Sequence, residues 1–360
     1  MSTHDNTEII PAALKPGDTI ALLSPSSRLN DIFPLRISRA TTALEVLGFK
    51  IKSIYTSLPT PCSHHQQIHH RVQELHSAFT DPSIRAIIST IGGLSSNELL
   101  PFIDWDLIRT NPKIFVGYSD ITLLHLGIFA QAGLRTFYGP AAITQFAEIP
   151  EPLGFTVEHF LHVLSPRTED VGKPVGRMPR SEVWTDEFGD WGNEDKELKA
   201  RKLERNDGWK WLRKGECEGR MTGGCLPSLL QLAGTRYWPS FQGKILLLEN
   251  PEGERPDGPL PLEQSRSLMA DLVNVGVLDE ISGLVVGRPT GYQGEELKGY
   301  EKVVLGICSG VKEDGTERNF PILFGVDVGH TDPMLTVPLN AMTRLSSEED
   351  VWEVLEPSVS

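Results

Sequence analysis

The sequence predicts an α/β protein of two domains, with a parallel sheet in the first domain and mixed α/β structure in the second. Its 360 residues are about twice the common domain length of roughly 150. Short apolar runs alternate with helical patterns, which is typical of βαβ units. Two runs, AIIST at 86–90 and KIFVG at 113–117, are apolar on successive residues, as in strands that are buried on both faces of a parallel sheet.

The first domain is expected to span residues 1–165 and to alternate strands with helices. The expected strands are Thr19–Leu23, Phe49–Tyr55, Ile84–Ile91, Lys113–Val116 and Arg135–Tyr138. The expected helices are Leu35–Leu47, Gln66–Phe79, Glu98–Ile108 and Ile121–Gln131. Gly48 and Gly133 follow two of these helices, at the position where a glycine commonly ends a helix.

Residues 166–218 interrupt this alternation with a charged segment that is poor in aliphatic residues. Four of the seven tryptophans of the chain lie in it, namely Trp184, Trp191, Trp209 and Trp211. Disordered segments are poor in aromatic residues, so we expect an ordered Trp-rich excursion that serves as linker and substrate loop. The alternative is that these rings only dock the excursion onto the domain surface.

The second domain is expected over residues 219–360, where the alternation resumes after a turn at Gly223–Gly224. The expected helices are Pro227–Leu232, Leu262–Val275 and Glu295–Ile307. The expected strands are Lys244–Glu249, Ile281–Val286, Ile322–Val326, Leu335–Val337, Ala341–Leu345 and Trp352–Leu355. The last of these strands follow one another with little helix between them, which predicts a mixed α/β domain.

Composition excludes several classes of function. Lys and Arg number 34 and Asp and Glu number 48, so the net charge of −14 opposes binding to nucleic acid and to anionic membranes. The four cysteines are scattered without zinc-ligand spacing, and no dinucleotide, P-loop or zincin motif is present. The sequence shows no signal peptide and no long apolar run. We therefore expect a cytoplasmic protein without a metal or cofactor.

The strongest local motif is KIFVGYSDIT at 113–122, in which a strand and a tight turn lead through Ser119 into a helix. A nucleophile elbow has this layout, because the turn places a hydroxyl at the carboxyl end of the sheet and at a helix N-terminus. Ile121 occupies the second glycine position of the common G-x-S-x-G pattern. The alternative is an ordinary helix N-cap.

Candidates for the base and the acid that would activate Ser119 lie at or just after the ends of expected strands. His330 follows the apolar run 322–328 and should lie on a turn that faces a cleft. Glu249 ends the apolar strand KILLLE, where burial requires a partner such as an imidazole. A solvent-exposed position or an ion pair with Arg255 or Arg266 is the alternative for Glu249. The order Ser119, Glu249, His330 is that of α/β-hydrolases.

The remaining requirement for this chemistry is a set of hydrogen-bond donors for the reacting oxygen. Gly92 and Gly93 follow the strand 84–91, and their N–H groups can approach a reacting oxygen closely. A turn without a ligand is the alternative there.

The segment HHQQIHH at 64–70 places His65 and His69 one helical turn apart, but no carboxylate or cysteine within it completes a metal site, so a solvated helix face is expected.

The chain resembles the LD-carboxypeptidase serine peptidases, a family that includes muropeptide tetrapeptidases and microcin C self-immunity peptidases. The segments that carry the resemblance are TIGG at 90–93, NELLPFID at 97–104, NPKIFVGYSDIT at 111–122, TFYGPA at 136–141, GGCLPSLLQLAGT at 223–235, KILLLEN at 244–250 and VGHTDPM at 328–334. It extends from about Lys15 to the C-terminus, in the family's order. This resemblance implies a flavodoxin-like first domain, a smaller mixed α/β second domain and usually a homodimer.

The resemblance also implies roles for individual residues. Ser119 matches the nucleophile, Glu249 the acid and His330 the base of a Ser-Glu-His triad in the cleft between the domains. The pair Gly92 and Gly93 and the backbone N–H of Asp120 match the oxyanion hole.

The segment SEVWTDEFGDW at 181–191 and the long excursion resemble the microcin C self-immunity branch more than the muropeptide enzymes. In that branch a tryptophan of this loop stacks on the nucleotide base of the substrate, and Trp184 is the matching residue. Cys225 and Glu252 are expected to contact substrate as well, although relatives often have Asn at the position of Cys225.

We therefore expect a serine hydrolase that cleaves an amide bond near the C-terminus of a small peptide or peptide-nucleotide-like conjugate through an acyl-enzyme. One alternative keeps the triad in a biosynthetic or detoxification pathway unrelated to murein. The other alternative is a catalytically inactive homologue that binds a small molecule.

Overall fold

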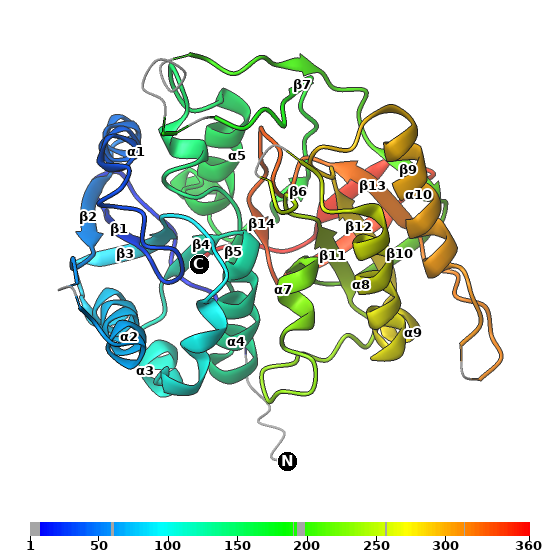
Figure 1. The fold of residues 1–360 in the computed structure, drawn as a ribbon, viewed down its shortest axis with the longest axis horizontal. Coiled ribbons are helices and arrows are strands. Elements are labelled where there is room, and N and C mark those ends of the chain that lie inside the picture. The colour runs from blue at the N-terminus through cyan, green and yellow to red at the C-terminus, as the bar shows by residue number, and fades with distance from the viewer. Residues whose placement is uncertain (1–7, 59–60, 190, 193–198, 256–257, 313) are drawn as a thin grey trace.

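Two β-sheets lie side by side in the molecule, each with helices packed against it (Figure 1). The computed structural model describes residues 8–58, 61–189, 191–192, 199–255, 258–312 and 314–360. Within these ranges the chain first forms five strands of the first sheet and then crosses to the second sheet through the excursion. Near its end it returns once and adds the last strand to the first sheet. The fold is mixed α/β with parallel strands in both sheets.

The first sheet has the strand order β14-β5-β4-β3-β1-β2. Its strands are β1 (Thr19–Leu23), β2 (Lys50–Ile54), β3 (Ile84–Ser89), β4 (Ile114–Gly117), β5 (Phe137–Tyr138) and β14 (Val337–Pro338). The pairs among β1 to β5 are all parallel, and their order is that of flavodoxin-like sheets. The expected fold class of this half is therefore confirmed.

Helices cover both faces of the first sheet. They are α1 (Pro34–Val46), α2 (His64–Thr80), α3 (Trp105–Thr110), α4 (Thr122–Ala132) and α5 (Gly154–Leu164). Apolar residues of α2, α3 and α4 pack with Ala21 and Phe115, whereas those of α1 and α5 pack with Ile20 and Val116. Because successive strand residues point to opposite faces, this double cover explains the continuous apolar runs of the sequence.

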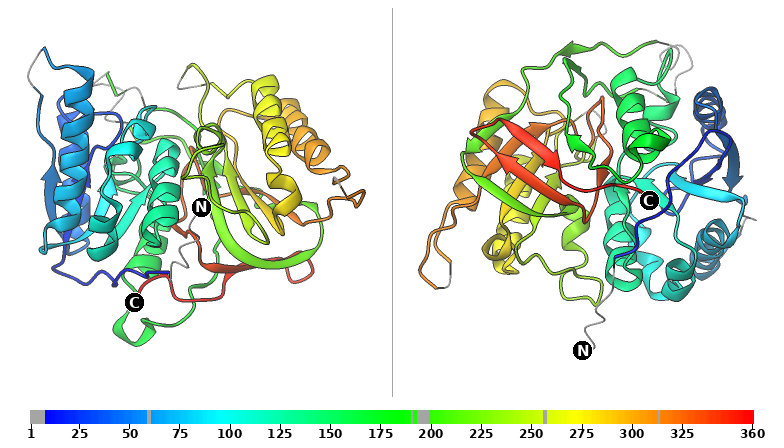
Figure 2. Two further views of the ribbon diagram at one scale, coloured as in Figure 1. Left: turned by 90° about the horizontal axis from the view of Figure 1, so that it is seen from below. Right: turned by 180° about the vertical axis from the view of Figure 1, so that it is seen from behind.

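The second sheet has the strand order β6-β16-β15-β10-β11-β12-β13-β9. Its central strands are β10 (Glu216–Cys225), β11 (Ile245–Glu249), β12 (Gly283–Gly287) and β13 (Ile322–Val326), which are parallel to one another. Strands β15 (Met342–Ser346) and β16 (Val351–Val354) pair antiparallel beyond β10. The helices α7 (Leu226–Leu230), α8 (Leu262–Asn274), α9 (Val277–Glu280) and α10 (Gly294–Cys308) pack on this sheet (Figure 2).

The excursion supplies short strands to the second sheet and a small ribbon. They are β6 (Gly176–Arg177), β7 (Val183–Trp184), β8 (Glu204–Arg205) and β9 (Lys210–Arg213). Trp209 is buried against Trp352 at 5.7 Å between ring centroids, and Trp211 Nε1 donates to Asp350 Oδ1 at 2.8 Å. These two tryptophans dock the excursion, while its residues 190 and 193–198 lie outside the described residues.

Three expected elements differ in the structure. Gly223 and Gly224 form no turn but lie inside β10, with φ of 126° and 143°. A Cβ on Gly224 would lie 2.8 Å from Cε2 of Tyr138, so glycine is needed where the two sheets meet. The expected strand at 335–337 becomes β14 and joins the first sheet instead of the second.

The expected helix 98–108 is broken into two short 3-10 turns, Ser96–Glu98 and Leu100–Phe102, followed by α3. Pro101 has no N–H for a continuous helix, and the Asp104 side chain accepts the Leu107 N–H at 3.0 Å, which starts α3 anew. In addition, α5 has no counterpart among the expected helices.

None of the helices within the described ranges combines the length and the apolar character needed to cross a bilayer.

Candidate active site

Ser119 lies on a strained turn between β4 and α4. It begins a short 3-10 turn, Ser119–Ile121, and its φ of 65° is in the left-handed region that non-glycine residues rarely adopt. Its N–H donates to the hydroxyl of Tyr138 at 3.0 Å. Gly117 permits the turn, because a Cβ there would lie 2.9 Å from Cγ2 of Ile121 and from Oγ of Ser89. This is the strand–turn–helix geometry of a nucleophile elbow.

Glu249 and His330 meet at the carboxyl end of the second sheet. Glu249 ends β11 and is fully buried, and His330 follows β13 on the turn that begins at Gly329. Nδ1 of His330 and Oε2 of Glu249 are 2.7 Å apart. Burial alone would lower the pKa of His330, but the charge and hydrogen bond of Glu249 outweigh it and, with Glu252 and Asp332, raise this pKa to about 9.

Glu252 and Cys225 flank this pair. Oε2 of the half-buried Glu252 lies 3.6 Å from Nε2 of His330, the ring nitrogen that Glu249 leaves free. Cys225 ends β10 in register with Glu249 and is buried. Burial and the charge of Glu249 raise the pKa of the Cys225 thiol well above its usual range, so the thiol stays neutral.

Gly92 lies directly against Ser119, and Gly93 lies against Ser26 and Ser27. A Cβ on Gly92 would be 2.7 Å from Cβ and 3.0 Å from Oγ of Ser119, and Gly93 has a φ of 156° with Oγ of Ser27 2.4 Å from its Cβ position. Within the described ranges, no hydrogen bond uses the N–H of Gly93 or of Asp120. Both donors are therefore available to an oxygen near Ser119.

The Asp120 side chain binds the segments on either side of the elbow through its carboxylate. Its Oδ2 accepts the hydroxyl of Ser26 at 2.6 Å and the N–H groups of Ser95 and Ser96 at 3.1 Å each. Burial raises the pKa of Asp120, although these hydrogen bonds oppose the shift.

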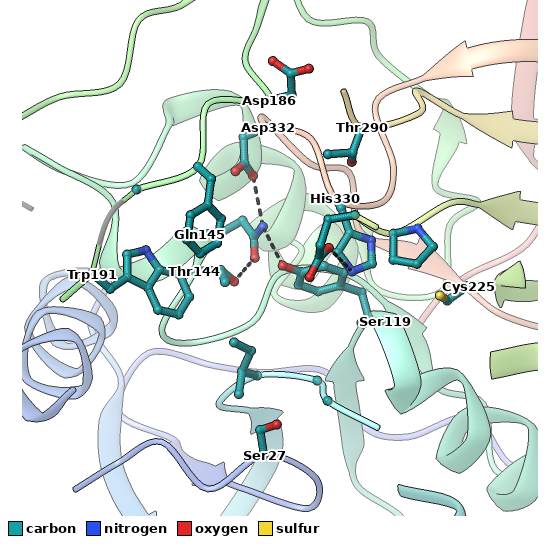
Figure 3. A pocket seen from close by; sticks show the side chains of 18 of the residues that line it. Ser27, Ser119, Thr144, Gln145, Asp186, Trp191, Cys225, Thr290, His330 and Asp332 are labelled. Atoms are coloured by element: carbon teal, nitrogen blue, oxygen red, sulfur yellow. Dashed lines mark hydrogen bonds and ion pairs between the residues drawn. The ribbon is translucent and has the colours of Figure 1, made fainter. Parts of the chain in front are cut away.

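One cavity of about 410 Å³ brings several of these residues together (Figure 3). Its wall includes Gly92, Gly93, Ser119, Cys225, Glu252 and His330. Both side chains line the cavity, and none of the described hydrogen bonds joins Oγ of Ser119 to His330. Hydrogen bonds between a nucleophile and its base are often loose before substrate binds.

Trp191 lines this cavity, whereas Trp184, the residue expected from the sequence to stack on substrate, lines a second one. Trp191 stacks on Phe188 with ring centroids 5.5 Å apart, and the Arg36 guanidinium lies 4.3 Å from the Trp191 ring (Figure 3). Trp184 lines a second cavity beside the first and lies under Arg288, at 5.0 Å. The pairing of β7 with β8 fixes this orientation, which no local sequence pattern reveals.

Asp332 joins the His330 turn to the excursion. Its Oδ2 accepts Nη2 of Arg201 at 2.7 Å, and its Oδ1 accepts Nε2 of Gln145 at 3.0 Å. Its backbone pairs with that of Thr185 through bonds of 2.7 and 2.9 Å. Arg201 also forms an ion pair with Glu148. The excursion is thereby held over the cavity that contains Ser119.

Sequence reasoning missed several residues of the cavity. Phe188 and Trp191 lie in the SEVWTDEFGDW segment, where the aromatic residues themselves were the available signal. Arg201, Gln145 and Asp332 carried no local signal, because their partners lie far away in the chain.

The histidines of α2 lie outside the cavity. His65 and His69 are exposed, and their Nε2 atoms are 2.9 Å apart. No group of three or more His, Cys, Asp or Glu side chains in the described part of the chain is arranged to hold a metal ion.

A two-sheet α/β fold with a strained serine and a Glu–His pair in one cavity defines the class of serine-type hydrolases. Residues 20–139 match the LD-carboxypeptidase N-terminal domain, and residues 218–345 match the LD-carboxypeptidase C-terminal domain. The chain belongs to the LD-carboxypeptidase family, and it is a serine-type peptidase that acts on peptide-like substrates.

Individual relatives are similar over nearly the whole length. A putative carboxypeptidase of Vibrio cholerae is 36% identical, over 95% of this chain and 96% of that protein. The microcin C7 self-immunity protein MccF of Escherichia coli is 34% identical, over 98% of this chain and 97% of that protein. The structure of MccF in complex with glutamyl sulfamoyl guanosine has a TM-score of 0.82 and 32% identity, covering 98% of this chain and 99% of that one.

Proposed function

We propose that Ser119, Glu249 and His330 act as a catalytic triad that hydrolyses an amide bond near the C-terminus of a small peptide or peptide-nucleotide-like conjugate. One observation carries this proposal: a serine with left-handed backbone shares a cavity with a histidine whose Nδ1 is bonded to a buried carboxylate. Glu249 holds the Nδ1–H tautomer of His330, so Nε2 is the basic nitrogen.

The reaction follows from these positions. Nε2 of His330 takes the proton of Ser119 Oγ as Oγ bonds to the substrate carbonyl carbon, and the oxygen that becomes negative is held by the N–H groups of Gly93 and Asp120. The C–N bond then breaks while His330 gives its proton to the departing nitrogen. Water next attacks the acyl-enzyme, loses a proton to His330 and releases the acid, and the proton returns to Ser119.

The composition of the cavity supports a conjugate that carries an aromatic group. Phe188 and Trp191 form an aromatic wall at some distance from Ser119, and base–aromatic stacking typically contributes about 1–3 kcal/mol. MccF, which is similar over nearly the whole chain, has been solved in complex with glutamyl sulfamoyl guanosine, a compound that carries an aromatic base. We propose Trp191, in place of Trp184, as the stacking residue, with Cys225 and Glu252 contacting the substrate near the scissile bond.

The deciding experiment combines covalent labelling with a substrate panel. A fluorophosphonate should add one adduct by mass to the wild type and none to Ser119→Ala. Turnover should fall by at least about 10³-fold in Ser119→Ala, because a triad acts as a unit. The panel contains a murein tetrapeptide, ordinary dipeptides and aspartyl sulfamoyl adenosine. Full turnover by Ser119→Ala would refute the proposal.

We also propose that the enzyme is a homodimer, as the family resemblance implies. Light scattering should then give twice the chain mass of 39.9 kDa. A single-chain mass across the micromolar range would contradict this.

A further inference from the structure

We propose that Tyr138 is a positioning residue that joins the two halves of the active site by a single hydroxyl, which fixes the backbone of Ser119 and the carboxylate of Glu249 relative to each other. This inference rests on the proposed function, since it assigns Tyr138 a role in the reaction of Ser119. The segment TFYGPA that contains Tyr138 has no other role in that reaction.

The Tyr138 hydroxyl makes two hydrogen bonds, one to each sheet. It accepts the N–H of Ser119 at 3.0 Å, on the turn after β4, and it donates to Oε1 of Glu249 at 2.6 Å, at the end of β11. Burial and the charge of Glu249 raise the pKa of Tyr138 well above its usual range, so the hydroxyl keeps its proton and can donate it. The direction of both bonds is therefore defined.

The position of Tyr138 leaves its ring little freedom. Its backbone pairs with Gly117 of β4 on one side and with Val337 of β14 on the other. The side chain is fully buried, and a Cβ on Gly224 of β10 would lie 2.8 Å from its ring. The hydroxyl is thus held between the two sheets by packing as well as by hydrogen bonds.

The bonds of Tyr138 complete a continuous chain from the serine to the histidine. Tyr138 uses Oε1 of Glu249, and His330 uses Oε2, so neither carboxylate oxygen is left without a partner. The chain runs from the Ser119 N–H through Tyr138 and Glu249 to Nδ1 of His330. Since a buried carboxylate is oriented by its hydrogen bonds, loss of one bond should loosen the other.

The backbone N–H groups near Ser119 have two different roles. Because Tyr138 occupies the Ser119 N–H, that N–H is engaged in holding the left-handed turn. The N–H groups of Gly93 and Asp120 have no such partner among the described hydrogen bonds, and they are the donors proposed for the oxyanion. Tyr138 therefore acts on the position of the nucleophile and not on the oxyanion.

The test compares Tyr138→Phe with Tyr237→Phe. Both substitutions keep a buried ring and remove one hydroxyl, and the hydroxyl of Tyr237 donates to the carbonyl of Leu100 at 2.9 Å, away from the cavity. We expect Tyr138→Phe to lower kcat by about 10–100-fold, as typical for outer partners that orient a functional histidine, with KM within twofold. Tyr237→Phe should leave both constants within twofold, and the thermal midpoints of the two variants should be similar.

A second measurement, the titration of His330, depends on the charge of the Glu249–His330 pair and not on the stability of the protein. A donated hydrogen bond favours the more negative, deprotonated form of the Glu249–His330 pair, so its loss should move the titration of His330 to higher pH. The other groups that face this pair are Cys225 and Tyr300 beside Glu249, and Tyr118, Glu252 and Asp332 beside His330. Tyr138→Phe leaves all of them in place. Nitrogen-15 shifts of labelled histidine report both the tautomer and the titration of His330.

The outcomes separate this inference from the proposed function. If the fluorophosphonate fails to label the wild type, the proposed function fails, and the His330 spectra of the two variants still judge Tyr138. An upward shift in Tyr138→Phe with none in Tyr237→Phe supports the inference, and unchanged spectra overturn it. If the fluorophosphonate does label the wild type, two kinetic results also overturn the inference. One is a Tyr138→Phe variant whose kcat is within twofold of wild type. The other is a loss of kcat in Tyr138→Phe that equals the loss in Tyr237→Phe.

A double-mutant cycle identifies the path of the effect. If Tyr138 acts through Glu249, Tyr138→Phe should change kcat by less than about threefold in a Glu249→Gln background. A full 10–100-fold loss in that background contradicts the joint positioning, because the effect would then be carried by the Ser119 turn alone.

Discussion

Oε2 of Glu249 accepts a hydrogen bond from Nδ1 of His330 at 2.7 Å, across 81 positions of the sequence. Both residues lie at the carboxyl ends of strands in one sheet: Glu249 closes β11, and His330 lies on the turn after β13, with β12 between these two strands. Gly287 and Gly329 make the contact possible, because a Cβ on either would lie 2.9 Å or less from the Glu249 side chain. The contact between Glu249 and His330 therefore depends on the sheet topology and on the lack of a side chain at Gly287 and Gly329.

The first prediction concerns the charge of Glu249. In Glu249→Gln the main cause that raises the pKa of His330 is gone while burial remains, so the pKa should fall from about 9. The acid limb of kcat/KM should move to lower pH, but kcat should fall by about 10³-fold or more, because the imidazolium loses its partner in the transition state. Steady-state kinetics between pH 5 and 10 measure both changes.

Glu280→Gln is the matched control for this variant. Oε2 of Glu280 accepts the N–H of Phe241 at 3.2 Å, near the opposite end of β11. This variant should keep its pH profile and its kcat. A Glu249→Gln enzyme with wild-type kcat would contradict the role of the pair.

The second prediction concerns Glu252, whose charge holds the proton on His330 in the free enzyme. Its carboxylate is 3.6 Å from Nε2 and raises the pKa of His330. In Glu252→Gln this pKa should fall, because one of the negative charges beside the imidazole is removed. Because only neutral His330 can accept the proton of Ser119, the rate of fluorophosphonate labelling at pH 7 should rise by about 3–10-fold.

The labelling rate is the suitable measurement, since the small probe needs no contact with Glu252. Glu254→Gln changes the net charge equally at an exposed neighbour and should leave the rate unchanged. An unchanged or lower labelling rate in Glu252→Gln would show that Glu252 does not hold the proton on His330.

The third prediction concerns the close approach of Gly92 to the nucleophile. A Cβ in Gly92→Ala would lie 2.7 Å from Cβ of Ser119, and neither atom can rotate away. The labelling rate should fall by about 100-fold, and the free energy of unfolding should fall by about 1–3 kcal/mol from overpacking. Labelling kinetics and urea denaturation test the two effects.

Gly306→Ala on α10 is the control for this substitution, because nothing lies within 4 Å of its Cβ position. It should leave labelling unchanged and raise the free energy of unfolding by up to about 1 kcal/mol, the helical preference for alanine. Labelling of Gly92→Ala at the wild-type rate would exclude the proposed proximity of this loop to the serine.

The parallel strands of both sheets could be predicted from the sequence, because burial on two faces leaves continuous apolar runs such as 113–117 and 244–249. β10 could not, since its sequence ECEGRMTGGC contains few strand-forming residues and ends in a glycine pair that resembles a turn. Gly224 is needed because β10 passes close to Tyr138 and Thr122 of the other half of the molecule, and Gly223 because a Cβ there would lie 2.0 Å from the carbonyl oxygen of Leu247 in β11. Such a requirement is tertiary and leaves no periodic signal.

The proposed triad of Ser119, Glu249 and His330 could be predicted from strand ends, residue order and the family resemblance, whereas the substrate side of the cavity could not. Arg201 and Asp332 pair across 131 positions, and each on its own resembles an ordinary surface charge. Trp184 and Trp191 lie in one short segment, and only the course of the chain between them decides which ring faces the cavity.

The last prediction therefore separates these two tryptophans. In Trp191→Ala the aromatic wall with Phe188 is lost, so KM for aspartyl sulfamoyl adenosine should rise by about 10-fold while kcat is retained. KM for a dipeptide without an aromatic base should change by less than twofold. Trp184→Ala removes a ring that contacts Arg288 in the neighbouring cavity, so both KM values should stay within twofold of wild type. If Trp184→Ala instead raises KM for the nucleoside substrate and Trp191→Ala does not, the excursion must rearrange on binding, and Trp184 must then be the stacking residue.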